Sequence, residues 1–545
     1  MSGTLLGAVA VGRRDLPFLA ALAVGIALRA AVMVAYRPAL LFPDSFGYLR
    51  LADDLRLSPV HPVGYPVLLW PIVHLLHSAY GIAAIQHVLG LAIAVAGYVF
   101  LARRGLPRWA AALATLPVLL DPLQLVLEQY VLSDLLFEAL LVAACLVLLW
   151  RPRRPGFTVL VATGLLGAAA TLTRGAGTLV LVAFLVAVVC LRVSWPRLVA
   201  FVLAALLPLA GYAVAFHHAH GAYALEASGP RFLYARLAPI VLCGDVPLPS
   251  YEEPLCPRTP LRDRRSIDWY MWHGEHAAQY RVQPPAGTTQ LQMVHDFDQR
   301  VLRAEPRRFA HSVAVQLLTG FSWTRHAHIK GRVAGRWLFH PDYWVLPMLV
   351  AHHRVQPGHT AGTSVDPAAA SFLTGYRHWV WTPGPLLALL LVPGVAAALG
   401  VGRSRRSGDR VAVGLLMAAC LVPLMTAVAV NGFSWRYQLP QVALLPMAGA
   451  LGTAALVRGA APGRRPGPLP RIRLVVLVLV AAATGGVVWL AAARSGWATT
   501  ATAATGGAVV AVLVALLLLV SRERSGRDGV PLTPPGSGGG TAEPR

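Results

Sequence analysis

The chain has 545 residues, of which 56% are hydrophobic and only 13% are charged. This composition excludes an ordinary soluble domain and is typical of a protein that crosses a membrane several times. The formal net charge of +23 does not indicate a nucleic-acid partner, because the arginine clusters lie in short segments at alternate ends of the apolar runs. That distribution follows the positive-inside rule and predicts that both termini are cytoplasmic.

Apolar runs approach the roughly 20 residues that a helix needs to span a bilayer, and their number predicts about twelve transmembrane helices. The runs lie at 16–36, 81–101, 109–127, 131–150, 157–173, 176–192, 198–216, 379–400, 411–430, 438–457, 474–493 and 504–520. The run 66–77 is shorter and contains prolines, so it predicts an interfacial helix.

These runs divide the chain into modules. We expect an N-terminal membrane module over 1–216, with a first outer loop at about 37–80, and a C-terminal membrane module over 379–520. Between them, 217–378 predicts an extracytoplasmic loop domain, and 521–545 is rich in Pro, Gly and Thr, which predicts a disordered cytoplasmic tail. The expected fold is an all-α polytopic membrane protein with a mixed extracytoplasmic loop domain. The sequence has no internal repeat of the kind that marks many secondary transporters.

The five cysteines fall into two groups by their position in the sequence. Cys145, Cys190 and Cys420 lie inside apolar runs and are expected to be core residues. Cys243 and Cys256 lie close together in the extracytoplasmic domain. Because that compartment is oxidising, we expect these two to form a disulfide.

The first outer loop carries an acidic residue, Asp44, directly after the first apolar run. One reading is structural: Asp44 or Ser45 would N-cap a helix over 46–57. The other is functional: a partly desolvated carboxylate at the membrane edge has a raised pKa and would serve as a general base. The two readings are compatible.

Further acids fall around the third and fourth runs. Asp134 and Glu138 are four residues apart and would share one helix face. Ionisable groups at membrane depth are costly and are functional candidates by default. Glu128 and Asp134 are therefore candidates for an acidic site that would bind a divalent metal ion or the acceptor. The structural alternative is a hydrogen bond between helices with one acid protonated.

Two arginines lie on the outer side, against the positive-inside trend: Arg174, between two apolar runs, and Arg436, which Tyr437 follows. The guanidinium group is always charged and matches a phosphate with a planar fork of donors. We interpret these residues as a site for a lipid phosphate. The alternatives are a salt bridge from Arg174 to one of the acids, and a snorkelling Arg436 in an aromatic anchor.

The layout and two short motifs resemble the GT-C integral-membrane glycosyltransferases. The motifs are the acid at Asp44 with the HPVGYP segment at 61–66, and the RYQLP segment at 436–440. The resemblance is to the branch of protein O-mannosyltransferases and aminoarabinose transferases, and covers about 15–457. Two positions depart from the usual pattern: Ser45 replaces the second acid of a pair, and Val63 replaces a proline.

The resemblance implies an enzyme that moves a sugar from a polyprenyl-phosphate donor to an acceptor hydroxyl or amine on the extracytoplasmic face of a bacterial plasma membrane. Asp44 would be the catalytic base, and Tyr48, His61 and Tyr65 would shape the substrate site. No cofactor is required, although a divalent metal is compatible with the acids. The acceptor would be a protein, a lipid or a glycan. The alternatives are a transporter or flippase of lipid-linked sugars, a structural membrane protein, and a surface-polysaccharide ligase or polymerase.

Overall fold

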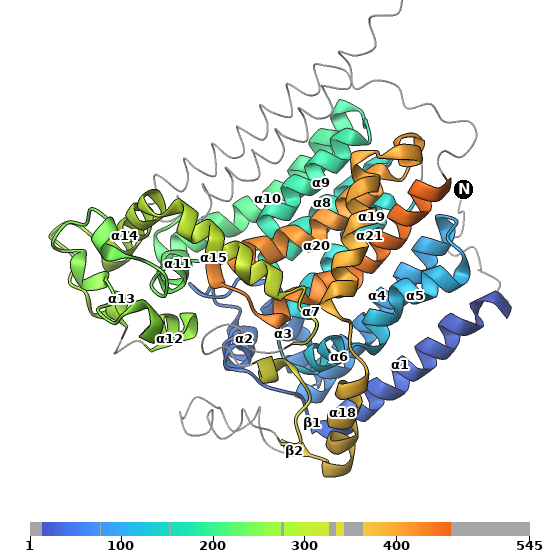
Figure 1. Ribbon diagram of the computed structural model, residues 1–545, viewed down its shortest axis with the longest axis horizontal. Coiled ribbons are helices and arrows are strands. Elements are labelled where there is room, and N and C mark those ends of the chain that lie inside the picture. Colours follow the sequence, from blue (N-terminus) through green and yellow to red (C-terminus); the bar gives the residue numbers. More distant parts are fainter. Residues whose placement is uncertain are drawn as a thin grey trace, which may run out of the picture.

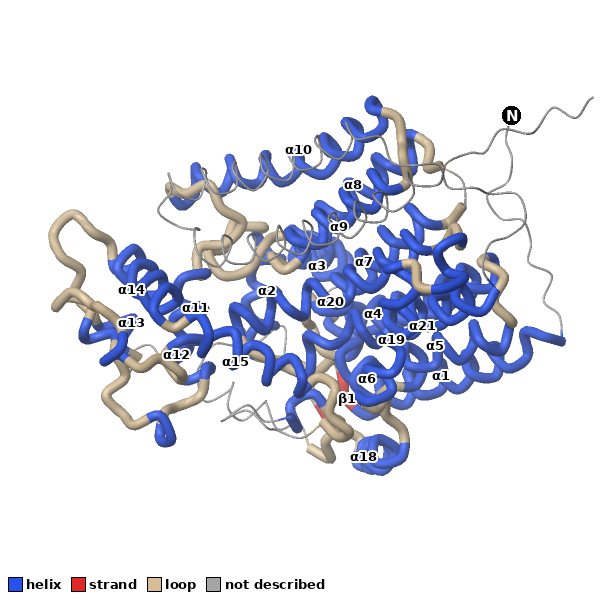
Figure 2. The backbone as a smooth tube through the Cα atoms, turned by 45° about the horizontal axis from the view of Figure 1, so that its top comes forward, coloured by secondary structure: helices blue, strands red, loops and turns tan. Residues whose placement is uncertain are grey.

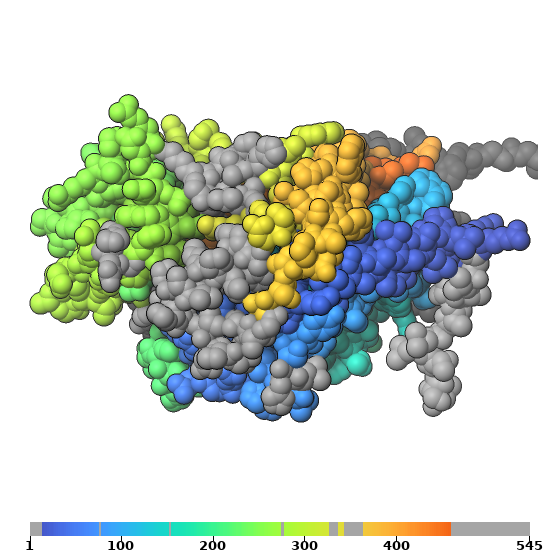
Figure 3. Space-filling model, turned by 90° about the horizontal axis from the view of Figure 1, so that it is seen from below, coloured from blue at the N-terminus to red at the C-terminus, as the bar shows by residue number. Residues whose placement is uncertain are grey.

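The computed structural model describes residues 13–76, 78–151, 154–273, 277–325, 334–342 and 363–458. Figure 1 shows a bundle of long helices with a smaller helical domain at one end. The space-filling view places this domain at the end of the molecule away from the start of the first helix (Figure 3). The predicted spans 474–493 and 504–520 and the predicted tail 521–545 lie outside the described residues.

The bundle is built from helices that are apolar over most of their surface, as a lipid environment requires. They are α1 (Leu16–Ala35), α4 (Ala79–Arg103), α5 (Arg108–Leu120), α7 (Asp134–Leu149), α8 (Phe157–Thr173), α9 (Gly177–Cys190), α10 (Trp195–His220), α19 (Gly384–Leu399), α20 (Arg410–Asn431) and α21 (Leu439–Arg458). Figure 2 shows α10 along one edge of the bundle, beside α8, against which it packs. Helix α21 is mostly buried, between α5, α19 and α20.

Shorter helices lie near the ends of the long ones: α2 (Pro43–Asp54), α3 (Gly64–Leu76), α6 (Pro122–Gln129) and α18 (Pro367–Trp379). Short 3-10 turns are η1 (Arg13–Asp15), η2 (Cys243–Asp245), η3 (Glu253–Leu255), η4 (Leu261–Asp263), η5 (Ala334–Trp337), η6 (Gly402–Arg406) and η7 (Trp435–Gln438). The described part of the chain has one sheet, in which β1 (Tyr36–Arg37) pairs antiparallel with β2 (Ser364–Val365). This pairing ties the end of α1 to the segment before α18.

The helical membrane fold agrees with the prediction, but the span count is supported only in part. Five described helices are long and apolar enough to cross a membrane, or up to seven if each bent pair is one span. Helices α3, α8 and α9 are apolar but shorter. The figure of about twelve therefore stays a prediction.

The apolar run at 109–127 is not one straight span. It forms α5 and α6, which are bent by 48° at Asp121 and Pro122. A proline has no N–H to continue the helix ladder, and Asp121 caps α6 by accepting a hydrogen bond from the Leu123 N–H at 2.8 Å.

A break at this depth leaves the last carbonyls of α5 without helical partners. Arg29 of α1 donates to the carbonyls of Val118 and Leu119 at 3.0 and 3.1 Å. Tyr376 of α18 donates through its hydroxyl to the Leu120 carbonyl at 2.6 Å. The broken span is therefore stabilised by side chains from two other helices.

The first outer loop also differs from its prediction. Helix α2 begins at Pro43, not at 46, and its N-cap is Phe42. The Ser45 hydroxyl accepts a hydrogen bond from the Phe42 N–H at 2.9 Å and donates to the Val131 carbonyl at 2.8 Å. Asp44 lies in the first turn of α2 and does not provide the predicted cap. Its carboxylate is free for another contact.

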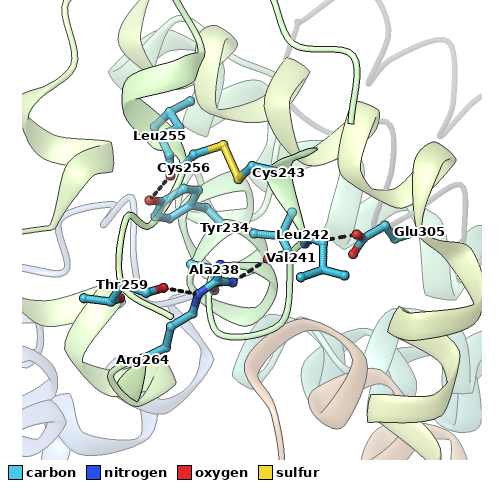
Figure 4. The surroundings of a disulfide bond; sticks show 10 residues. All are labelled: Tyr234, Ala238, Val241, Leu242, Cys243, Leu255, Cys256, Thr259, Arg264 and Glu305. Atoms are coloured by element: carbon cyan, nitrogen blue, oxygen red, sulfur yellow. Dashed lines mark hydrogen bonds between the residues drawn. A yellow bond between two sulfur atoms is a disulfide. The ribbon is translucent and has the colours of Figure 1, made fainter. Parts of the chain in front are cut away.

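The domain that the sequence predicts to be extracytoplasmic contains α11 (Gly229–Leu237), α12 (Ile267–Trp272), α13 (Ala278–Arg281), α14 (Gln290–Ala304) and α15 (Pro306–Thr319). It has its own apolar core. Figure 4 shows the disulfide between Cys243 and Cys256 beside this core. Nearby, the Tyr234 hydroxyl donates to the Leu255 carbonyl at 2.7 Å, and Arg264 donates to the Ala238 carbonyl at 3.0 Å.

Gly64 of the HPVGYP segment lets α3 approach the end of α8. A Cβ at Gly64 would lie 2.6 Å from the Thr173 Oγ1 and 2.7 Å from the Leu172 carbonyl carbon. We expect Gly64→Ala to lower the free energy of unfolding by about 1–3 kcal/mol through overpacking. The measurement is the melting temperature in detergent, with Gly211→Ala as control because nothing lies within 4 Å of a Cβ there. Equal melting temperatures for Gly64→Ala and wild type would show that the contact has no effect on stability.

Candidate functional site

Two acids and two arginines come together at one end of the bundle. Arg436 of η7 donates through Nη1 to the Asp44 Oδ2 at 2.9 Å, and the same nitrogen lies 4.0 Å from the Asp134 Oδ2. Arg174, which follows α8, donates to the Asp134 Oδ1 at the start of α7. The cluster therefore joins segments that lie far apart in the sequence, and its formal charges balance.

Aromatic rings surround the guanidinium groups. The ring of Tyr437 lies 5.3 Å from the Arg436 guanidinium carbon and 5.2 Å from that of Arg174. Phe42 and Trp337 face Arg436 at 5.6 and 5.4 Å. These rings exclude water from one side of the cluster and stabilise its cations.

The side chains of the cluster are partly exposed to solvent. The side chains of Asp44 and Arg436 are each 15% exposed and that of Arg174 is 18% exposed. The ion pairs that the structure records for these arginines use Nη1, and a guanidinium group carries further N–H donors. A ligand that brings an anion to this edge would therefore compete with the carboxylates for both arginines.

The pKa of the Asp44 carboxyl is shifted in the direction opposite to the one that the sequence suggests. Burial alone would raise its pKa, but Arg436, with His61 and Arg174, holds the pKa of the Asp44 carboxyl below its usual value. The prediction of a raised pKa is therefore wrong for the protein without substrate. Its cause is the charge of Arg436, a partner more than 390 positions away that no local pattern reveals.

The predicted substrate-shaping residues adjoin Asp44. Tyr48 packs against His61 and Tyr65, with ring centroids 4.6 and 5.0 Å apart, and its hydroxyl is 3.0 Å from the Ser133 hydroxyl. Burial lowers the pKa of His61, while the Asp44 charge opposes this shift. The Tyr65 hydroxyl donates to Gln86 at 2.8 Å. These residues form one wall next to the charged cluster.

Glu128 lies in a separate network inside the bundle. It accepts from Arg29 at 2.6 Å and is 2.8 Å from the His87 Nδ1, and all three side chains are buried. Gly90 of α4 leaves room for it, since a Cβ there would lie 1.9 Å from the Glu128 Oε1. Gln124 connects Glu128 with Glu138, at 3.1 and 3.0 Å. The structure therefore places Glu128 and Asp134 with different cationic partners.

A further buried pair joins the break in the third span to the outer segments. Arg325 binds both oxygens of Asp121, at 2.7 and 2.9 Å. The Thr382 N–H, at the bend between α18 and α19, donates to the same carboxylate at 2.8 Å. This pair fixes the two bent spans to each other. Among the described residues, no group of three or more His, Cys, Asp and Glu side chains could hold a metal ion.

Several residues of these networks were not singled out from the sequence. Arg29 had a signal, because it is the lone charge in the run 16–36. His87, Phe42 and Trp337 had none, since an isolated histidine or aromatic residue in an apolar setting is ordinary. Only the packing of the helices shows their roles.

Residues 74–216 match the family model of dolichyl-phosphate-mannose-protein mannosyltransferases. This segment contains Asp134 and Arg174 and ends before α11. The match confirms the resemblance to GT-C membrane glycosyltransferases that the motifs suggested. The chain matches no curated protein.

The fold has a distant likeness to an archaeal oligosaccharyltransferase. The crystal structure of the apo enzyme from Archaeoglobus fulgidus has a TM-score of 0.39 and 14% identity, over 89% of this chain and 56% of that one. The structure of the same enzyme, AglB, with an inhibitory peptide and a dolichol-phosphate has a TM-score of 0.38 and 13% identity, over 88% and 56% of the two chains. This chain therefore spans just over half the length of these proteins, and at such scores the likeness carries no argument about its activity.

Glu128 and Asp44 should respond differently to neutralisation. We expect Glu128→Gln to lower the free energy of unfolding by about 3–5 kcal/mol, because it leaves the buried Arg29 charge without its carboxylate. Asp44→Asn should cost less, since Asp44 and Arg436 reach solvent. The measurement is the melting temperature of both variants in the same detergent. A larger loss for Asp44→Asn would contradict the assignment of Glu128 to a stabilising network.

Proposed function

We propose that this membrane glycosyltransferase of the GT-C type moves a sugar from a polyprenyl-phosphate donor to an acceptor hydroxyl or amine on the extracytoplasmic face. The observation that carries the proposal is the cluster of Arg436, Arg174, Asp44 and Asp134 at the outer ends of the helices. In the proposed orientation, two cations and two carboxylates would lie where the membrane meets water. A donor with an apolar tail and a phosphate head requires this combination.

The donor phosphate would lie against Arg174 and Arg436, with Tyr437 between the two guanidinium groups. Guanidinium groups match phosphate oxygens through paired N–H donors. The phosphate would replace Asp44 and Asp134 as a partner of the arginines. Arg436 lowers the pKa of Asp44 in the protein without substrate, so the loss of that contact would make Asp44 more basic. Donor binding would thus activate the base.

In the transfer step, Asp44 would accept the proton of the acceptor hydroxyl while the acceptor oxygen attacks the anomeric carbon. The bond between that carbon and the phosphate oxygen breaks, and its electron pair leaves with polyprenyl phosphate. The two arginines would stabilise the negative charge that develops on the phosphate. A single displacement of this kind inverts the anomeric centre. Tyr48, His61 and Tyr65 would shape the acceptor side.

The layout of the whole protein follows from this site. We place the cluster on the extracytoplasmic face of a bacterial plasma membrane, with both termini cytoplasmic. The domain at 217–378 would then lie outside and present the acceptor, which is a protein, a lipid or a glycan. The sugar is a hexose, a pentose or a derivative. The same site would also suit a polysaccharide ligase or polymerase, which would use the same kind of donor with another acceptor.

The decisive test is the release of polyprenyl phosphate. Purified wild type and Asp44→Asn are incubated with a panel of polyprenyl-phosphate sugars and with membrane extract as the source of acceptor. We expect release by wild type and a loss of about 10²–10⁴-fold in the variant, the usual effect of a general base. The matched control is Asp54→Asn, at the exposed end of α2, where Asp54 pairs with the exposed Arg56. Normal turnover by Asp44→Asn would remove Asp44 from the mechanism, and binding of the donor without turnover by wild type would favour a transporter or flippase.

Arg436→Lys tests the phosphate site. Lysine keeps the charge but loses the planar fork, so we expect the affinity for polyprenyl phosphate to fall by about tenfold, the effect of losing one charged hydrogen bond. Binding is measured by equilibrium titration in detergent, with Arg56→Lys as control because Arg56 is exposed. An unchanged affinity in Arg436→Lys would show that the phosphate binds elsewhere.

A further inference from the structure

Glu226 lies at the edge of the charged cluster, in the segment between α10 and α11. The backbone around it is fixed to the first outer loop, since the Ala227 N–H and the Ser228 hydroxyl both donate to the Pro59 carbonyl, at 2.7 and 3.0 Å. The Glu226 side chain is half-buried. A Cβ added at Gly175 would lie 3.4 Å from its Oε1, so the carboxylate lies over the turn that carries Arg174.

Glu226 differs from the other acids at this end of the bundle. Asp44, Asp134 and Asp121 each pair with an arginine. Within the described ranges, no side chain or backbone group makes a hydrogen bond or ion pair with the Glu226 carboxylate. A half-buried carboxylate without a donor is unfavourable, and a hydrogen bond from a ligand would stabilise it.

The surroundings of Glu226 place its titration in the neutral range. Burial raises the pKa of Glu226 to about 7, and the charge of Arg174 opposes this shift. The phenol of Tyr212 also lies within electrostatic range and is neutral there. At the end of α10, His220 is 2.9 Å from the Leu57 carbonyl, and the ring of His217 packs against Tyr223.

We propose that Glu226 contacts the substrates of the transfer reaction, and that its carboxylate accepts a hydrogen bond from a hydroxyl group held beside Arg174. The hydroxyl belongs either to the donor sugar or to the acceptor. An ionised carboxylate offers only acceptor sites, so its ligand must bring a donor, which polyols supply. The inference rests on the proposed function, because it assumes that a sugar phosphate occupies the arginine site. It adds a second carboxylate to a site in which Asp44 is the base.

The consequence is a specific dependence on pH. The pKa of Asp44 lies below its usual value, so Asp44 is ionised throughout the neutral range. The pKa of Glu226 is about 7, so Glu226 changes charge in this range. Since the ionised form accepts the hydrogen bond, kcat/KM should rise with pH through about 7, and Glu226→Gln should remove this rise. Glu226→Asp keeps a titrating carboxylate and should retain a rise with pH.

The experiment compares wild type with Glu226→Gln, and uses Glu253→Gln, an exposed glutamate of the extracytoplasmic domain, as the matched control. Two quantities are measured for each: turnover, as release of polyprenyl phosphate from a polyprenyl-phosphate sugar, and equilibrium binding of that sugar donor and of bare polyprenyl phosphate. We expect Glu226→Gln to lower kcat/KM by about 10- to 100-fold above pH 7, the effect of losing a hydrogen bond to a charged group.

The binding measurements distinguish the source of the hydroxyl. Weaker binding of the sugar donor, with unchanged binding of bare polyprenyl phosphate, assigns the contact to the donor sugar. Unchanged binding of both, with reduced turnover, assigns it to the acceptor. An equal change in the binding of both lipids would show that Glu226 acts only through its charge on Arg174, and would overturn the proposal. Turnover and a pH profile of Glu226→Gln equal to those of wild type would also overturn it. If wild type turns over no donor, the proposed function fails, while the difference between the two lipids still decides whether Glu226 contacts a sugar.

Discussion

The ion pair between Asp44 and Arg436 joins residues separated by 392 positions in the chain. It connects the first turn of α2 with η7, immediately before α21, and thereby closes the outer end of the bundle. Asp134 lies 4.0 Å from the same guanidinium nitrogen and is itself bonded to Arg174. Because each charge offsets another, the cluster can be largely buried without an unpaired ion. In the proposed reaction, an entering phosphate would compete with these carboxylates for the arginines, and this competition would give the site its chemistry.

The buried charges form two classes that differ in exposure. The Arg29, Glu128 and His87 side chains are at most 3% exposed. Through Arg29, this network binds the carbonyl groups that the break between α5 and α6 leaves without helical partners. The Asp44 and Arg436 side chains keep 15% of their surface, enough for solvent or substrate to reach them. Position in the membrane alone does not separate these classes, whereas exposure and hydrogen bonding do.

Much of the candidate site could be predicted from single residues, because a charge at the outer end of an apolar run is rare and costly. That reasoning identified Asp44, Asp134, Arg174 and Arg436, and the structure brings them together. It also offered the salt bridge of Arg174 as an alternative, and this bridge is present. The salt bridge and the proposed phosphate binding are compatible, since one arginine can bind a carboxylate and a phosphate in turn.

The rest of the site depends on packing that a linear pattern does not contain. The sign of the Asp44 pKa shift is set by Arg436, and the break at Asp121 is stabilised by Arg325 and Arg29 from other segments. The run 109–127 reads as one span because it is apolar apart from Thr115, Asp121 and Gln124. The proline at 122 signals the bend, but the side chains that compensate for it come from elsewhere. Glu226 gave no signal, because an isolated glutamate in a loop is ordinary until its neighbours are known.

The segment that carries Arg436 is also fixed to the helical domain formed by α11–α15. Arg236 of α11 donates to the Val428 carbonyl at the end of α20 at 3.1 Å and to the Ser312 hydroxyl of α15 at 3.0 Å. Gln316 of α15 accepts from the Phe433 N–H at 2.8 Å. One short stretch before α21 therefore contacts the domain on its outer side and the charged cluster on its inner side. In the proposed reaction, the acceptor approaches from the domain and the lipid-linked donor from the membrane, so a change in the domain's position would act directly on the arginine that holds the phosphate.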